Sequence, residues 1–197
     1  MSGGQAGEEL FEIVDEHDKV IGLAPRSLCH GHPELVHRVA HVLVFNRRGA
    51  LLLQKRALSK DIQPGKWDTS VGGHLMPGED YEQAARREYR EELGIADAHL
   101  ELWGPSRIRN AVESENVMTY VTCHEGPFRF DPGEIDEVRF WTAAEIDAAL
   151  GAGTLTPNFE VQWRRWLAED PETRCSLLER CLANACGKQE VQGSAKE

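Results

Sequence analysis

Short apolar runs separated by polar turns dominate the first part of the chain and predict β-strands. The segment Leu10–Leu23 holds two such runs on either side of the polar Asp15–Lys19, which predicts a β-hairpin. Val36–Phe45, rich in valine, and Ala50–Lys55 flank the turn Asn46–Gly49 and predict a second hairpin. Strands are therefore expected to form the centre of the fold.

The segment Glu79–Leu93 has the features of a helix instead. It consists of good helix formers, three of its first four residues are acidic, where the helix dipole favours negative charge, and Gly94 stands where many helices end. Further strands are expected around Asp68–Val71, His99–Trp103, Val117–Cys123 and Val138–Trp141, and further helices at Thr142–Leu150 and Phe159–Leu167. Strands with interspersed helices predict an α+β fold or a three-layer α/β/α arrangement, with a mixed sheet flanked by helices.

The length of 197 residues suits one domain with a sizeable core. We expect this domain to span residues 10–170, with the first hairpin as an N-terminal arm. Residues 1–9 are small and polar and are expected to be disordered, and residues 171–197 are expected to form a C-terminal helix and a polar tail. The sequence has no apolar run of the roughly eighteen residues that a membrane span needs, and no signal peptide is visible.

Net charge and cysteine content limit the expected cellular compartment and the classes of binding partner. Five cysteines without a CxxC pair make a poor disulfide framework, so free thiols and a cytoplasmic location are the simpler interpretation. A net charge of −11 disfavours nucleic acid as a partner, because such affinity depends on Lys and Arg neutralising phosphates. A small phosphorylated substrate is compatible with this charge if a metal ion supplies the positive charge. We expect no membrane partner and a monomer or homodimer.

Three carboxylates on the predicted helix lie where a solvated face is not expected. Glu88, Glu91 and Glu92 fall within an arc of about 100°. The apolar stripe beside this arc consists of Ala85, Tyr89 and Leu93. Like charges repel at this spacing, and Arg87 offsets only part of the repulsion by pairing with Glu91. The alternative is an ordinary acidic surface, but carboxylates that border a buried face favour a hard cation such as Mg²⁺.

The same segment resembles the Nudix box, the metal-binding motif of the Nudix hydrolases. Gly73, Glu79 and the run Arg87–Ile95 match every fixed position of that motif, and the one departure is Tyr89, where the family usually has an aliphatic residue. The arm sequence Ile13–Gly22 resembles a subgroup of Nudix hydrolases that carries such a hairpin. The resemblance implies the Nudix sandwich fold, with three α/β/α layers.

The resemblance also implies roles for individual residues. The carbonyl of Gly73 and the carboxylates of Glu88, Glu91 and Glu92 would ligate Mg²⁺ or Mn²⁺, while Arg87 and Glu79 would orient the glutamates. A metal-activated water would then attack phosphorus in a diphosphate. The catalytic set predicted on this basis is Arg87, Glu91, Glu92 and Glu137.

Two roles lie outside the box and stay open. A general base could come from the box or from a later loop, where the candidates are Glu134, Asp136 and Glu137. Lys55 and Arg56 could contact substrate phosphate, or could simply be the solvent side of a strand.

A second resemblance is to type I isopentenyl diphosphate isomerase, which shares the fold. The metal-binding set of that family, three histidines and two glutamates, would correspond to His30, His37, His74, Glu113 and Glu115, a possible second metal site for Mn²⁺ or Zn²⁺. The catalytic cysteine of the isomerase, however, would fall at Gly72. The leading prediction is therefore a metal-dependent Nudix hydrolase that cleaves a diphosphate linkage in a nucleoside diphosphate derivative or related organic pyrophosphate. The alternatives are an isomerase-like protein and a non-catalytic nucleotide-binding module.

Overall fold

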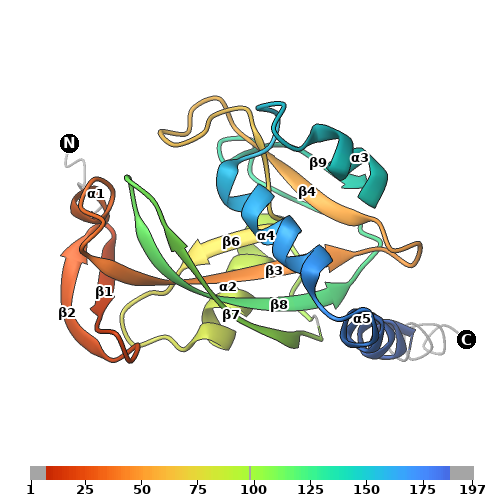
Figure 1. The fold of residues 1–197 in the computed structure, drawn as a ribbon, viewed down its shortest axis with the longest axis horizontal. Helices are drawn as coiled ribbons and strands as arrows, with labels where there is room; N and C mark the ends of the chain where they lie inside the picture. Colours follow the sequence, from red (N-terminus) through yellow and green to blue (C-terminus); the bar gives the residue numbers. More distant parts are fainter. Residues whose placement is uncertain (1–7, 98, 187–197) are drawn as a thin grey trace, which may run out of the picture.

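The computed structural model describes residues 8–97 and 99–186, and this part of the chain forms nine strands and five helices (Figure 1). The strands are β1 (Leu10–Val14), β2 (Val20–Pro25), β3 (Val36–Phe45), β4 (Leu51–Arg56), β5 (Trp67–Asp68), β6 (Val71–His74), β7 (Glu101–Arg109), β8 (Ser114–Cys123) and β9 (Ile135–Trp141). The helices are α1 (Arg26–Cys29), α2 (Tyr81–Leu93), α3 (Ala143–Ala149), α4 (Pro157–Ala168) and α5 (Pro171–Cys186). Most of the N-terminal segment for which disorder was predicted, and the end of the predicted polar tail, lie outside the described residues (1–7 and 187–197).

The strand β3 is the centre of a mixed sheet. It pairs with β8 in parallel along its whole length, and β7 continues the sheet beyond β8. The other edge of β3 is shared by three strands in turn: β1 near its start, β6 in its middle and β4 at its end. β2 extends the sheet from β1, and β4 also pairs with β5 and β9. The predicted mixed sheet is confirmed.

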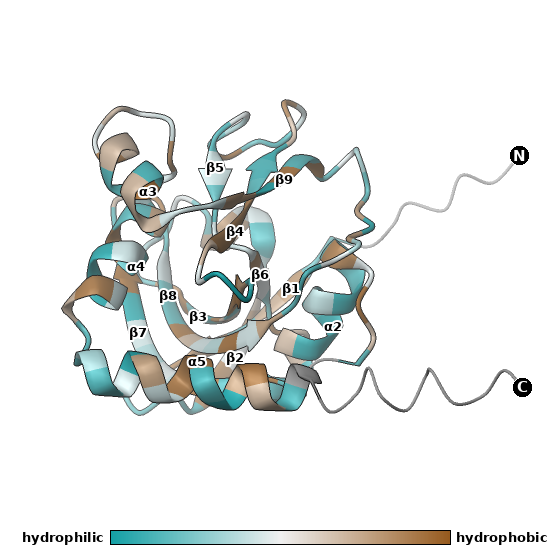
Figure 2. Ribbon diagram, turned by 90° about the vertical axis from the view of Figure 1, so that its right-hand side faces the viewer, coloured by the Kyte–Doolittle hydropathy of each residue, from teal (hydrophilic) through white to brown (hydrophobic). Residues whose placement is uncertain are grey.

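Alternate residues of β3 face two separate hydrophobic cores. Ala40, Val42 and Val44 pack against the buried stripe of α2, whereas Leu43 and Phe45 pack in the core that includes residues of α4 and α5. Figure 2 shows α2 and α4 on opposite sides of β3. Helices on both faces of a mixed sheet form the predicted three-layer arrangement.

The helix α2 begins and ends where its sequence dictates. The carboxylate of Asp80 caps the backbone N–H of Gln83, whose side chain in turn accepts from the backbone N–H of Asp80. Gly94 ends the helix in the left-handed conformation, with φ of 71°, as expected for a glycine at this position. Tyr89 is only 1% exposed and packs with Leu93 in the core, so a tyrosine is accommodated at this position of the motif.

The first predicted hairpin is confirmed, but the second is correct only at its turn. β3 and β4 pair at Phe45 and Leu51, after which β4 diverges to pair with β9. The expected strand Asp68–Val71 is divided between β5 and β6, because Ser70 bonds to both neighbouring strands. Its hydroxyl accepts from the N–H of Val44 at 2.9 Å and donates to the carbonyl of Leu52.

Across the described residues, every helix is too short or too polar to cross a membrane. Cys29, Cys123, Cys175 and Cys181 are free thiols, and the side chain of Cys186 lies outside the described part.

Candidate active site

A cavity of about 620 Å³ opens where β6 and α2 approach the N-terminal arm and the start of β8. Nine carboxylates line it, against the four cationic side chains Arg26, Arg56, Lys60 and Arg87. Because like charges repel, this excess of carboxylates favours cations in the cavity. Gly73, Arg87 and the three predicted glutamate ligands line this cavity together with most of the predicted histidine set.

Glu88 reaches the cavity past the backbone of β6 at Gly73. A Cβ atom at residue 73 would lie 2.0 Å from Cδ and 2.1 Å from Oε1 of Glu88. Any side chain at this position would therefore occupy the space that the carboxylate fills, and only glycine permits the approach. The first requirement of the site is thus that residue 73 on β6 has no side chain.

Glu92 lies beside Glu88 and has only neutral hydrogen-bond donors among the described residues. Its Oε2 accepts from Gln54 Nε2 at 3.0 Å and from the backbone N–H of Gly72 at 3.2 Å. Burial, and next the charge of Glu88, raises the pKa of Glu92 to about 8. Burial also raises the pKa of Glu88, although Arg87 opposes this. Protein groups alone compensate this carboxylate pair poorly, and a bound cation would do so directly.

Arg87 holds the carboxylates in place. Its guanidinium donates to both carboxylate oxygens of Glu79, at 2.8 and 2.9 Å, and to the carbonyl of His74 at 2.9 Å. It also donates to Glu88 at 2.6 Å and to Glu91 at 3.1 Å. The side chain of Glu91 is 55% exposed, at the solvent edge of the cavity. Arg87 therefore ties the start of the motif, at Glu79, to two of its three glutamates.

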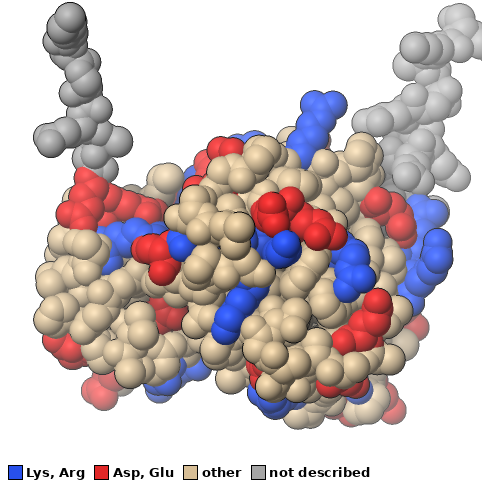
Figure 3. Space-filling view, turned by 90° about the horizontal axis from the view of Figure 1, so that it is seen from above, with Lys and Arg blue, Asp and Glu red and all other residues tan. Residues whose placement is uncertain are grey.

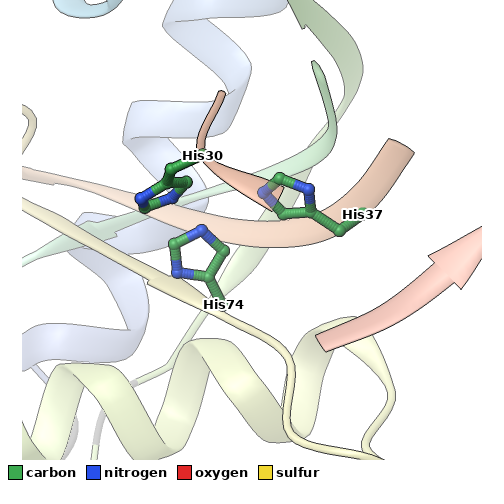
Figure 4. Close-up of side chains that lie close together, drawn as sticks. All are labelled: His30, His37 and His74. Carbon is green, nitrogen blue, oxygen red and sulfur yellow. The ribbon is translucent and has the colours of Figure 1, made fainter. Parts of the chain in front are cut away.

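Three histidines from separate segments point toward one another (Figure 4). His30 follows α1, His37 lies on β3 and His74 ends β6, and one ligand nitrogen from each lies within 4.8 Å of the others. The Nε2 atoms are buried and have no hydrogen-bond partner among the described residues. Nδ1 of His37 lies 3.1 Å from the carbonyl of Leu35, so it donates there and leaves the Nε2 lone pair free. Buried nitrogens with free lone pairs are suited to a metal ion.

Two carboxylates of the β7–β8 region face these histidines. Oε1 of Glu115 lies 3.6 Å from Nε2 of His37 and 3.5 Å from Nε2 of His74, and Glu113 lies 3.9 Å from Nε2 of His30. Burial alone would raise the pKa of Glu115, but the two imidazoles outweigh it and hold the pKa well below its usual range. These separations exceed ordinary hydrogen bonds, so the five side chains surround a space between them.

The N-terminal arm supports the histidine group. The ring of Phe11 stacks on His74 with 3.9 Å between centroids and 14° between planes, and on His37 at 5.1 Å and 24°. Phe11 is 1% exposed and belongs to a small core with Ile13 and Cys29. The arm therefore packs against the rings of His37 and His74, and His30 follows it in the chain after the short helix α1.

Three consecutive residues of β6 join the carboxylate group to the histidine group. The N–H of Gly72 donates to Glu92, Gly73 gives space to Glu88, and the imidazole of His74 faces Glu115. The two groups are thus neighbours in one cavity, separated by the length of a short strand segment.

Of the other predicted residues, some line the cavity and some do not. Arg56 lines it, and its Nε donates to the carbonyl of Ile62 at 2.9 Å. Lys55 does not, and its ammonium pairs with Asp136 at 2.8 Å on the outer side of β4. Glu137 is exposed and opposite Lys55 in the β4–β9 pairing, so the structure brings neither residue to the site. Among the proposed loop bases, Glu134 lines the cavity and pairs with Lys60.

Sequence reasoning missed His41 and Gln54, which line the cavity from β3 and β4. Each is a polar residue inside an apolar run, and that interruption was the available signal. Whether such a polar residue faces a cavity depends on which strands lie beside β3 and β4, and the local sequence pattern does not predict that pairing.

Residues 35–159 match the family model described as the NUDIX domain. The chain therefore belongs to the Nudix family, as the fold and the arrangement of Gly73 and the α2 glutamates indicate.

Its relatives include proteins with two different names. An isopentenyl-diphosphate Delta-isomerase of Streptomyces avermitilis is 38% identical over 151 residues, covering 74% of this chain and 77% of the relative. An uncharacterised Nudix hydrolase of Yersinia pestis is 34% identical over 164 residues, covering 83% and 88%. Among solved structures, DR0079 of Deinococcus radiodurans has a TM-score of 0.69 and 29% identity, covering 80% of this chain and 98% of that one.

The fit of Glu88 beneath β6 predicts the effect of a small change at Gly73. Gly73→Ala should displace the Glu88 carboxylate, because the new methyl group would overlap it, and should weaken Mg²⁺ binding at least about tenfold. Titration calorimetry with Mg²⁺ measures this. Gly22→Ala is the control, since a Cβ there meets nothing within 4 Å. Equal Mg²⁺ affinity in both variants would contradict the assigned role of Gly73.

Proposed function

We propose that this protein is a metal-dependent Nudix hydrolase that cleaves a diphosphate linkage in a nucleoside diphosphate derivative or a related organic pyrophosphate. The observation that carries the proposal is the neighbouring pair Glu88 and Glu92, half-buried where they line the cavity, with Glu91 at its edge. The match to the Nudix family supports the same reaction class.

The residues fit a divalent cation of the Mg²⁺ type. Glu88, Glu91 and Glu92 present hard oxygen ligands, and because burial and then the charge of Glu88 raise the pKa of Glu92 to about 8, a positive charge beside it would favour its ionised form. The carbonyl of Gly73 would be a further ligand. A bound divalent cation would supply Lewis acidity and an activated water for attack on phosphorus.

The chain's own cations would hold the phosphates. Arg56 and Lys60 line the cavity from one side and Arg26 from the arm, and each is paired with a carboxylate: Asp68, Glu134 and Glu9 respectively. A bound diphosphate would replace these carboxylates as the ion-pair partner of the three cationic side chains. Arg87 acts by positioning, because its donors are already engaged by Glu79, Glu88 and His74.

The substrate is expected to be small. On the face seen in Figure 3, acidic and basic side chains of the described residues are interspersed, without a broad basic surface for a polyanion.

We further propose that His30, His37 and His74, with Glu113 and Glu115, bind a second divalent ion. Imidazole nitrogens with carboxylates favour Mn²⁺ or Zn²⁺ over Mg²⁺. The buried Nε2 atoms without a partner are the observation that supports this site. The second ion would add positive charge to a cavity rich in carboxylates.

Isomerisation of a prenyl diphosphate is the second candidate function. The curated isomerases among the relatives and the histidine group favour it. Gly72, however, stands where the resemblance places the catalytic cysteine, and the described residues that line the cavity include no cysteine. A strongly polar cavity lining is also a poor match for a hydrocarbon tail.

A phosphate-release screen with Mg²⁺ or Mn²⁺ tests hydrolysis. Its substrates are nucleoside di- and triphosphates, nucleotide sugars, dinucleoside polyphosphates and prenyl diphosphates. With the best substrate, Glu92→Gln should lower kcat at least about a thousandfold, because a metal ligand is lost while the fold remains. Glu82→Gln, on the exposed side of α2, is the matched control. Full activity in Glu92→Gln would eliminate the metal assignment.

Elemental analysis of the purified protein tests the second ion. We expect about one equivalent of Mn²⁺ or Zn²⁺, lost in His37→Ala and in His74→Ala, because each removes a ligand nitrogen. His32→Ala is the control, since His32 is exposed and pairs with Glu34. Metal content that is unaffected by either ligand substitution would contradict the site.

Deuterium incorporation separates the two candidate reactions. Incubation with isopentenyl diphosphate in deuterated water should give no deuterated allylic product, because no thiol faces the substrate at residue 72. Mass spectrometry of the recovered diphosphates measures this. Clear deuterated product would favour the isomerase instead.

A further inference from the structure

His41 marks the boundary between the cavity and the apolar core on β3. On the same face of the strand, His37 precedes it in the histidine group, while Leu43 and Phe45 follow in the core with α4. His41 lines the cavity. The roles assigned above to the metal sites and the phosphate-binding cations do not use it.

The ring of His41 is held from behind by α4. Nδ1 lies 2.9 Å from the side-chain Nε2 of Gln162, which is also 3.5 Å from the hydroxyl of Thr119 on β8. With the amide donating, Nδ1 is the acceptor, so the neutral imidazole carries its proton on Nε2. Burial lowers the pKa of His41, which favours this neutral form.

The other edge of the ring faces Gly72. The two residues are opposite each other in the β3–β6 pairing. A Cβ atom at residue 72 would lie 3.0 Å from Cδ2 and 3.2 Å from Nε2 of His41, and 3.2 Å from the methyl carbon Cγ2 of Thr69. Gly72 does not have a positive φ, so its backbone does not require glycine. The missing side chain instead leaves space in front of the imidazole N–H.

Gly72 adjoins residues of both candidate cation sites. Gly72 donates its N–H to Glu92, and two residues later the imidazole of His74 faces Glu115. A phosphate group held in the cavity beside Gly72 would be within reach of the imidazole N–H of His41, whose direction Gln162 fixes. A neutral N–H adds no charge that would repel the ions.

We propose that His41 and Gly72 form a phosphate subsite, in which the Nε2–H of His41 donates a hydrogen bond to a non-bridging oxygen of the substrate's diphosphate. The inference rests on the proposed function, since it assumes a diphosphate in this cavity. Gln162 is then a positioning residue that sets the direction of the ring.

Binding of methylenediphosphonate, a diphosphate analogue that resists hydrolysis, tests the subsite without turnover. In titration calorimetry with Mg²⁺ present, His41→Leu should weaken its binding at least about tenfold, the effect of losing a hydrogen bond to a charged oxygen. Mg²⁺ affinity itself should be unchanged. His41→Gln should retain most of the affinity, because its amide offers an N–H. Gly72→Ala should weaken binding similarly, since its methyl group fills the subsite.

The control is His17→Leu, the same substitution at an exposed residue of the arm, and this variant should bind the analogue like the unmodified protein. Thermal unfolding identifies folded variants, and if His41→Leu is unfolded, Gly72→Ala decides. Undiminished binding by folded His41→Leu or, where that variant is unfolded, by Gly72→Ala overturns the subsite, as does no binding by the unmodified protein. If the analogue binds as described but no diphosphate is hydrolysed, the subsite stands and the proposed function fails.

Discussion

The approach of the Glu88 carboxylate to Gly73 is the contact on which the site depends. It requires that residue 73 of β6 has no side chain and that α2 directs the carboxylate of Glu88 into the space this leaves. The helix is fixed by its Asp80 cap and by the apolar stripe that α2 buries against β3. Burial of the stripe is favourable, and it brings the adjacent glutamates out of water at the same time. The unfavourable electrostatics of the carboxylates therefore follow directly from the packing that stabilises the helix.

Much of this could be predicted from the sequence, because it is encoded locally. The limits of α2, the arm hairpin and the arc of carboxylates follow from periodicity, caps and turns over a few residues. The histidine group came from a resemblance and not from spacing, since its members come from three distant segments. Only the parallel pairing of β3 with β8 sets Glu115 beside His37, and nothing in either segment specifies that partner.

Where the structure departs from the predicted site, the cause is again the pairing of distant strands. Lys55 and Arg56 are neighbours on one strand, so their side chains leave opposite faces and only one of them can reach the cavity. The sequence does not show which face is inward until β9 is placed beside β4, and that pairing leaves Lys55 with Asp136. His41 was missed for the complementary reason. In a strand buried on both faces, a polar residue becomes informative only when its neighbours, Gly72 and Gln162, are known.

Family membership does not settle the chemistry, because β6 serves both kinds of candidate metal site at once. Gly73 makes room for a carboxylate ligand of hard cations, and His74 offers an imidazole to softer ones. The residue before these two is Gly72, where the resemblance to the isomerase places a thiol and where this chain has no side chain beside the imidazole of His41. A side chain at residue 72 would meet the imidazole of His41 directly, so this one position limits what the cavity can hold beside both groups of candidate ligands.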